Sequence, residues 1–287
     1  MIKEFKRALG EFNDKTFVTA IAEVDFSFSK ETLHPCLCVK HPKHGLISPL
    51  EGRTLATIAE IHLALRMGAS ITYISAVVIE SKDGLLFRDH LKILIDERSK
   101  AKDNGDKLLD QLYKLYVNTL YGKTAQGITP KSSFNLRDRE TKVLGYSPVS
   151  QAYIASMITG TLRAALSAVI FSTDELNAQG HDYLVISATT DGLLYRVSSK
   201  ADVAFKDALK SPYHDDIPSA LKSGDKIFER FENVDPILYN KLLEFPVLRL
   251  IQHSRELLGY DEYIEIKHAV NSVLNIKTRG QIGAYCV

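Results

Sequence analysis

Hydrophobic and polar residues in the N-terminal third of the chain follow both strand and helix periods. The stretch 19–28 (TAIAEVDFSF) alternates and predicts a β-strand, and 36–52 predicts a strand, a loop and a second strand. The stretch 54–70 predicts an amphipathic helix with Thr54 as its candidate N-cap. Because the β-rich stretch 71–81 follows, the pattern predicts an α+β fold for this part.

The pattern then becomes mainly helical. Residues 86–122 predict two antiparallel helices, because Asn104-Gly105 is a strong turn signal in the middle of a helical stretch. The segment 127–148 is polar and irregular, which indicates a loop or a small β-hairpin. The apolar stretch 150–171 predicts a buried helix, and 182–197 places two apolar runs around a Thr-Thr-Asp-Gly turn, a β-hairpin signal.

Composition narrows the class of protein. Of the 287 residues, 45% are hydrophobic and 25% charged, as in ordinary globular domains. The formal net charge of +1 excludes a histone-like mode of DNA binding but leaves room for a local basic groove. Three cysteines are too few for a disulfide framework. No apolar run approaches the ~18 residues of a membrane helix, so we expect a soluble, cytoplasmic protein. No Pro/Gly/Ser-rich linker is found, which favours one continuous domain.

One helical stretch, KLYVNTLYGK at 114–123, carries groups that suit a nucleotide. At roughly 100° per residue, Lys114, Asn118 and Tyr121 fall on one stripe of the helix. An ammonium, an amide and a phenol suit a ligand with charge and flat rings, and Gly122 allows close approach to the backbone. The alternative is a surface helix with a solvated Lys114 and a glycine C-cap. An apolar stripe on the opposite side is predicted to pack on the protein: Leu109, Leu112, Tyr116 and Leu120.

The preceding helix carries two cations on one face. Arg98 and Lys102 are one turn apart, and two cations on a facing helix suit a polyphosphate. The alternative is an exposed basic face whose charges pair with Asp96, Glu97 or Asp106. The residues alone leave both interpretations open.

The stretch KLYVNTLYG at 114–122 resembles the K-x3-N-S-x-Y-G motif of family B DNA polymerases, with threonine in the serine position. Two further segments follow in the family's order. VISATTDGLLY at 185–195 resembles the palm hairpin usually written D-T-D-S, and IKTRG at 276–280 resembles a lysine-bearing motif next to the thumb. The resemblance starts near Ala20 and is nearest to the protein-primed and primer-independent branch of plasmids, organelles, viruses and mobile elements.

The resemblance implies an α+β fold in which a DNA polymerase palm carries an inserted fingers subdomain made of an α-helical hairpin. The expected parts are a first palm segment at 1–84, the fingers hairpin at 85–126, a short insertion loop or hairpin at 127–147, and a second palm segment at 148–287 that leads to a truncated thumb. Protein-primed members use the insertion for strand displacement and processivity, and its shortness here puts both properties in question.

The resemblance also implies roles in template-directed nucleotidyl transfer. The triphosphate of the incoming deoxynucleotide would be bound by cations of the hairpin, with Lys114 also counted as catalytic. Asn118 and Tyr121 would line the nascent base pair, and Gly122 would let the template approach. The phosphate-binding set is Arg98, Lys102 and Lys114.

Metal and DNA contacts are implied in the same way. Asp191 would be catalytic and would hold Mg²⁺, of which the complete enzyme is expected to bind two ions. Lys277 and Arg279 would contact the primer–template. The implied partners are primer–template DNA, deoxynucleoside triphosphates, and a terminal protein or an upstream polymerase segment, without a membrane. The implied location is the cytoplasm of a bacterial, viral or mobile-element host, or an organellar matrix.

Two departures from the family pattern favour a fragment or split subunit that is inactive alone. The hairpin reads Thr189-Thr190-Asp191-Gly192, so a threonine takes the place of the first acid. The D-x-x-S-L-Y-P motif with the other metal ligand is not found, and Asp25 is interpreted as an exposed residue on an edge strand. The alternatives are a catalytically inactive remnant that binds DNA or nucleotides, and a structural α+β protein with accidental matches.

A second cluster, at 34–44, contains three histidines and two cysteines, residue types that bind zinc. Its Cys-x-Cys spacing is shorter than that of zinc knuckles. Strand alternation would instead bury Cys36 and Cys38 on one face. We therefore interpret the cysteines as small core residues.

Overall fold

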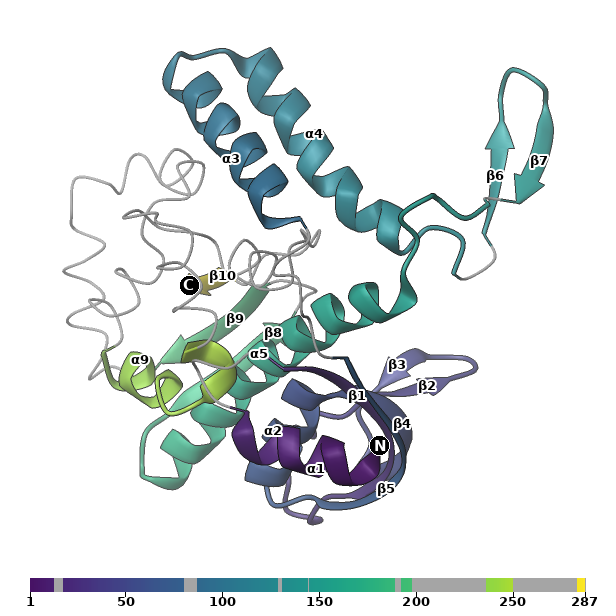
Figure 1. The fold of residues 1–287 in the computed structure, drawn as a ribbon. Helices are drawn as coiled ribbons and strands as arrows, with labels where there is room; N and C mark the ends of the chain where they lie inside the picture. Colours follow the sequence, from purple (N-terminus) through teal and green to yellow (C-terminus); the bar gives the residue numbers. More distant parts are fainter. Residues whose placement is uncertain are drawn as a thin grey trace.

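The computed structural model describes residues 1–12, 18–79, 87–128, 131–143, 145–188, 192–197, 236–249 and 283–286. Helices and strands are mixed along the chain, in agreement with the predicted α+β class. A three-stranded sheet, a projecting helical hairpin and a second small sheet are arranged around one long helix (Figure 1).

The N-terminal sheet is antiparallel, in the order β4 (Glu51–Thr57), β1 (Thr19–Ser27), β5 (Ser70–Ile79). Strand β1 alternates as predicted, with one face buried through Ala20, Ala22, Val24 and Phe26. The sheet curves around two helices, α1 (Ile2–Glu11) and α2 (Ile58–Arg66) (Figure 1). A small hairpin, β2 (Val39–His41) and β3 (Gly45–Ile47), extends beside it.

Helix α2 starts three residues later than the sequence predicted. Thr54 lies within β4, and the N-cap is Thr57, whose hydroxyl accepts from the Glu60 N–H while the Glu60 carboxylate accepts from the Thr57 N–H. This reciprocal pair satisfies two N–H groups at the helix start. The Thr57-x-x-Glu60 spacing is that of a capping box, and this spacing in the sequence indicates the observed helix start.

The long helix α5 (Ala152–Ala178) packs against α2, β4 and β8. Glu60 on α2 is only 3% exposed and accepts from Arg163 Nε on α5 at 2.8 Å. Contrary to expectation, α5 contains a window long and apolar enough for a membrane span, but 61% of that window is buried inside the protein. A core helix of a globular protein has the same length and composition.

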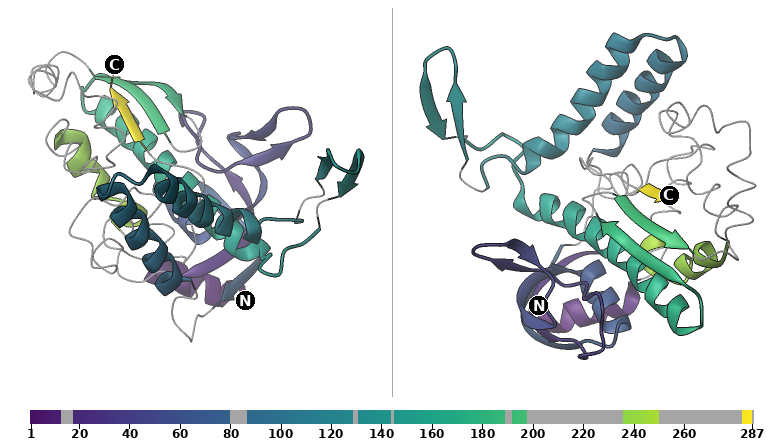
Figure 2. Two further views of the ribbon diagram at one scale, coloured as in Figure 1. Left: turned by 90° about the horizontal axis from the view of Figure 1, so that it is seen from above. Right: turned by 180° about the vertical axis from the view of Figure 1, so that it is seen from behind.

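The predicted helical hairpin is confirmed. Helices α3 (Arg88–Asp103) and α4 (Lys107–Thr124) pack side by side and project away from the first sheet (Figures 1 and 2). Gly105 adopts φ +70° at the turn, and Asp106 Oδ1 accepts from the N–H groups of Leu108 and Leu109 at the start of α4. The polar segment that follows forms an exposed hairpin, β6 (Ser132–Asn135) and β7 (Glu140–Val143).

The expected packing of the apolar stripe of α4 is wrong for most of its length. Leu109 and Leu112 are each 40% exposed and Tyr116 is 56% exposed, whereas Leu120 packs partly against the core. Among the described side chains of α4, Val117, which lies beside this stripe, and Thr124 at the end of the helix are buried. Because α4 projects with α3 as its main partner, only a narrow face is covered.

A second sheet lies alongside α5 (Figure 1). Its order is β10 (Gly283–Cys286), β9 (Gly192–Val197), β8 (Tyr183–Ala188), with β8 and β9 antiparallel and β10 parallel to β9. The predicted hairpin strands are therefore present. Helix α9 (Pro236–Leu242) packs against α5 next to this sheet (Figure 2).

We expect Gly160→Ala to destabilise the fold by about 1–3 kcal/mol, as overpacked sites generally are. An added Cβ at Gly160 would lie 2.3 Å from Thr57 Cγ2 and 2.6 Å from Glu60 Oε2. Both side chains are fixed by the N-cap bonds, so they have little room to move. Urea unfolding followed by circular dichroism measures the change.

Gly10→Ala is the matched control, because nothing lies within 4 Å of a Cβ at that helical position. It should leave stability unchanged or raise it by up to about 1 kcal/mol. Equal unfolding midpoints for the two variants would contradict the close packing of α2 on α5.

Candidate functional site

The stripe predicted on α4 faces solvent. Lys114 is exposed, Asn118 and Gly122 are partly buried, and Lys114 forms no hydrogen bond or ion pair with other residues that the structure describes. Tyr121 belongs to α4, but its side chain lies outside the description. The described part of the stripe thus presents an ammonium and an amide one turn apart.

Arg98 lies next to this stripe and is held by a carboxylate. Its Nε donates to Asp110 Oδ1 at 2.7 Å, and the two side chains are 26% and 28% exposed. Asp110 precedes Lys114 by one turn of α4, so Arg98 of α3 reaches the face that carries Lys114. The ion-pair alternative named Asp96, Glu97 or Asp106, and the observed partner is a different residue.

Lys102 follows Arg98 by one turn on α3 and is exposed. The hairpin therefore carries three cations, Arg98, Lys102 and Lys114, on neighbouring positions of its two arms. The carboxylate of Asp110 pairs with Arg98 and lies one turn from Lys114. Such a surface can bind a multiply charged anion.

Three predicted site residues lie outside the described part of the chain: Asp191, Lys277 and Arg279. The structure describes the strands on either side of Asp191, which pair as far as Ala188 and Leu193. Their pairing confirms the hairpin but not the position of the carboxylate.

Asp25 was assigned to an edge strand, and that assignment is wrong. It lies on β1, the central strand, and is 44% exposed. Its two carboxylate oxygens accept from Arg53 Nε at 2.7 Å and from a terminal Arg53 nitrogen at 2.8 Å. These bonds lower the pKa of Asp25. Asp25 is thus engaged in an exposed ion pair with Arg53.

The described residues contain no group of three or more histidine, cysteine or acidic side chains that could hold a metal ion. Of the cluster at 34–44, His34 Nδ1 pairs with Asp174 Oδ2 at 2.9 Å, and His41 stacks on His44. Cys36 is buried, which raises the pKa of its thiol, but Cys38 is only partly buried. The two cysteines precede β2, so they do not share a strand face as predicted.

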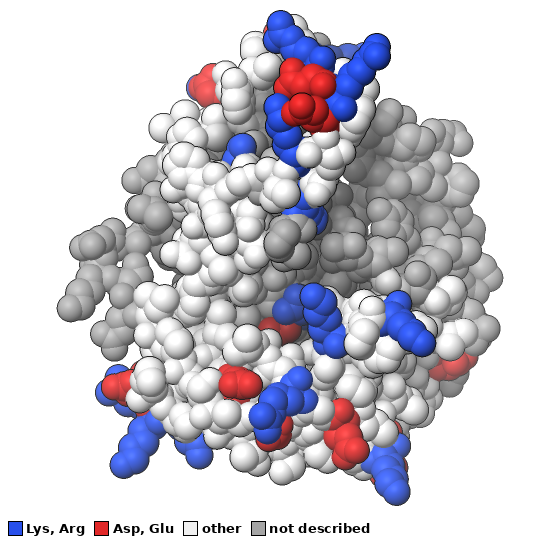
Figure 3. All heavy atoms as spheres, turned by 90° about the vertical axis from the view of Figure 1, so that its right-hand side faces the viewer, with Lys and Arg blue, Asp and Glu red and all other residues white. Residues whose placement is uncertain are grey.

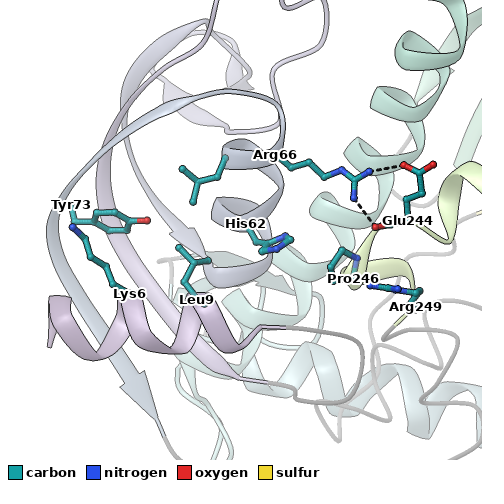
Figure 4. A pocket seen from close by; sticks show the side chains of 10 residues that line it. Lys6, Leu9, His62, Arg66, Tyr73, Glu244, Pro246 and Arg249 are labelled. Carbon is teal, nitrogen blue, oxygen red and sulfur yellow. Dashed lines mark hydrogen bonds and ion pairs between the residues drawn. The ribbon is translucent and has the colours of Figure 1, made fainter. Parts of the chain in front are cut away.

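A pocket of about 860 Å³ lies between α1, α2, β5 and residues 244–249 (Figure 4). Helices α1 and α2 lie away from the helical hairpin (Figure 1). Arg66 donates to the Glu244 carboxylate and carbonyl oxygen and stacks on Phe245. Burial lowers the pKa of His62, and the charge of Arg66 lowers it further. No predicted site residue lines this pocket.

Charged side chains are mixed on the face drawn in Figure 3, where Lys and Arg lie among Asp and Glu. On the β6–β7 hairpin, for example, Lys142 pairs with Asp138 and Glu140. Positive and negative side chains thus lie close together on this face, as the near-zero net charge of the sequence suggests. The three cations of the α3–α4 hairpin are therefore the more specific feature.

Comparison with known proteins places these elements in a family. A family model described as DNA polymerase type B, organellar and viral, matches residues 4–191, roughly two thirds of the chain. The primer-independent DNA polymerase PolB of Escherichia coli is 31% identical over 186 residues, which are 62% of this chain and 21% of that protein. The chain thus spans about a fifth of its relative's length. No solved structure matches.

The family match includes the whole α3–α4 hairpin and ends at Asp191. The resemblance carried by residues 114–122 is thereby confirmed at the level of the family. The chain belongs to the organellar and viral family of type B DNA polymerases.

Proposed function

We propose that the chain is the part of a DNA-directed DNA polymerase that receives the incoming deoxynucleoside triphosphate. The observation that carries the proposal is the α3–α4 hairpin, which presents Arg98, Lys102 and Lys114 on adjoining positions in a chain of this family. In this proposal α3–α4 acts as the fingers, and the flanking sheets with α5 form the palm.

Charge is the basis of nucleotide binding in this proposal. A triphosphate carries several negative charges, and charge-assisted hydrogen bonds from ammonium and guanidinium groups are the strong ones. Lys114 is exposed and has no described partner, so it is available without breaking an existing contact. The same cations would stabilise the charge that develops on the leaving pyrophosphate.

The remaining assigned residues extend the site toward the base pair and the DNA. Asn118 and Gly122 follow Lys114 on α4, and the family motif adds Tyr121 beside the nascent base pair. Lys277 and Arg279 are proposed to contact the primer–template. Primer–template DNA and a second polymerase segment or a terminal protein are the proposed partners.

The described residues contain no cluster of three or more histidine, cysteine or acidic side chains for a metal ion. Asp191 is the residue we assign to metal binding. In polymerases of this chemistry, two magnesium ions activate the primer hydroxyl and neutralise the leaving oxygen.

A second candidate function is nucleotide or DNA binding without catalysis. Thr189 at the position of the first acid of the hairpin favours it. Both candidates require the cations of the hairpin, and they differ only in chemistry.

Lys114→Ala should weaken binding of a deoxynucleoside triphosphate by about 1.5–3 kcal/mol, the range for hydrogen bonds to charged groups. Binding of the nucleoside without phosphates should change much less. Isothermal titration calorimetry with both ligands measures the difference.

Lys100→Ala is the matched control for charge. Lys100 lies two residues, or roughly 200°, around α3 from Arg98 and pairs with Glu97. It should leave triphosphate binding nearly unchanged. If Lys114→Ala weakened both ligands equally, Lys114 would support the fold rather than bind phosphate.

The chain by itself should bind primer–template DNA weakly and extend the primer little or not at all. Phosphate contacts need only cations, so binding should persist and fall steeply with salt. Catalysis needs several carboxylates around two ions, and Asp191 alone is assigned. Gel-based extension assays with Mg²⁺ measure the activity.

Adding a separate segment with the D-x-x-S-L-Y-P motif should restore extension if the two segments assemble. Strong magnesium-dependent extension by the chain alone, abolished by Asp191→Ala, would contradict the prediction. It would also exclude the binding-only function.

A further inference from the structure

We propose that Asp110 is a built-in competitor for Arg98, which it holds in the nucleotide-free hairpin and releases when a triphosphate binds. The inference rests on the proposed function, because it needs Arg98 to bind phosphate. It makes Asp110 a positioning residue that lowers the affinity for the triphosphate and fixes the guanidinium until the ligand arrives.

The contact uses a guanidinium nitrogen that can also donate to a phosphate. Arg98 Nε lies 2.7 Å from Asp110 Oδ1, a distance typical of charge-assisted bonds. A carboxylate and a phosphate both offer two oxygens to the same guanidinium edge. Each side chain is about one quarter exposed, so an anion from solvent can reach the pair.

The position of Asp110 extends its effect to a second cation. Asp110 and Lys114 are four residues apart on α4, so the carboxylate lies one turn from the ammonium as well as on Arg98. Its negative charge therefore offsets both cations in the free protein. A bound triphosphate would meet that same charge as a repulsion.

The opposite interpretation is that the pair only joins the two helices. The hairpin has other contacts for that purpose: the Asp106 bonds at the start of α4, the Gly105 turn, and buried side chains on both arms, Leu91, Ala101 and Val117. A joining role predicts weaker ligand binding when Asp110 is neutralised. A competing role predicts the reverse.

The test compares the affinity of a deoxynucleoside triphosphate for wild type, Asp110→Asn, Arg98→Ala and the double variant by calorimetry at fixed salt. Asp110→Asn should bind about three- to tenfold more tightly, because the competent state no longer has to break an ion pair. Asp110→Glu, which keeps the charge, should bind like wild type. The gain should disappear largely in the Arg98→Ala background.

Asp103→Asn is the matched control. Asp103 is an exposed carboxylate of the same hairpin and forms no ion pair with the described residues. It should change the affinity less than twofold, the size of a weak surface charge effect. An equal gain in affinity from Asp103→Asn and Asp110→Asn would overturn the inference, because loss of any negative charge on the hairpin would then explain the gain.

Unchanged or weaker binding by Asp110→Asn, with Arg98→Ala still weakening binding, would also overturn the inference and leave the proposed function intact. If Arg98→Ala had no effect, the phosphate-binding role of Arg98 itself would fail. If the Asp110→Asn variant does not fold, the NMR resonance of the Arg98 Nε–H group in the wild-type protein tests the inference instead. It should shift when triphosphate is added, and an unmoved resonance at saturation would overturn the inference.

Discussion

A buried carboxylate joins helix α2, which packs on the first sheet, to the long helix α5. Glu60 is 3% exposed, and its oxygens accept from the Thr57 N–H and hydroxyl, both at 2.9 Å, and from Arg163 Nε at 2.8 Å. A charge can be buried only when its oxygens are satisfied in this way. The same side chain thus caps α2 and joins it to α5, and Gly160 makes the close approach possible by lacking a Cβ.

The position of the candidate site depends on this junction through α5. At its start, the N–H of Gln151 donates to the Thr124 carbonyl at the end of α4. The hydroxyls of Ser147 and Ser150 donate to the carbonyls of Lys123 and Gln126. Because α5 is fixed to the sheet by Glu60 and to α4 by these bonds, the face with Lys114 has a defined direction relative to the sheet.

Local patterns were sufficient for much of the fold. The alternation of β1 and the Asn104-Gly105 turn depend on neighbouring residues only, and both were predicted correctly. Helix α1 was overlooked, although Phe5 and Ala8 recur at helical spacing and are buried. Thr54 was predicted as the N-cap, but strand β4 continues through Thr54 to Thr57, and Thr57 caps the helix instead.

Features that depend on packing between distant segments were not predictable in the same way. Asp25 was placed on an edge strand because the order β4-β1-β5 is not visible in the sequence. The partner of Arg98 is set by the register of two helices, and a residue twelve positions away was therefore not among the candidates. The exposure of Leu112 likewise follows from how far the hairpin projects.

The central claim is that the α3–α4 hairpin binds the triphosphate of an incoming nucleotide. The most direct test is photo-crosslinking with a deoxynucleoside triphosphate that carries a photoreactive group on its γ-phosphate, followed by peptide mapping. The account predicts labels within residues 88–124 that unlabelled triphosphate removes. Competable labels confined to α1, α2 and residues 244–249, around the separate pocket, would contradict it.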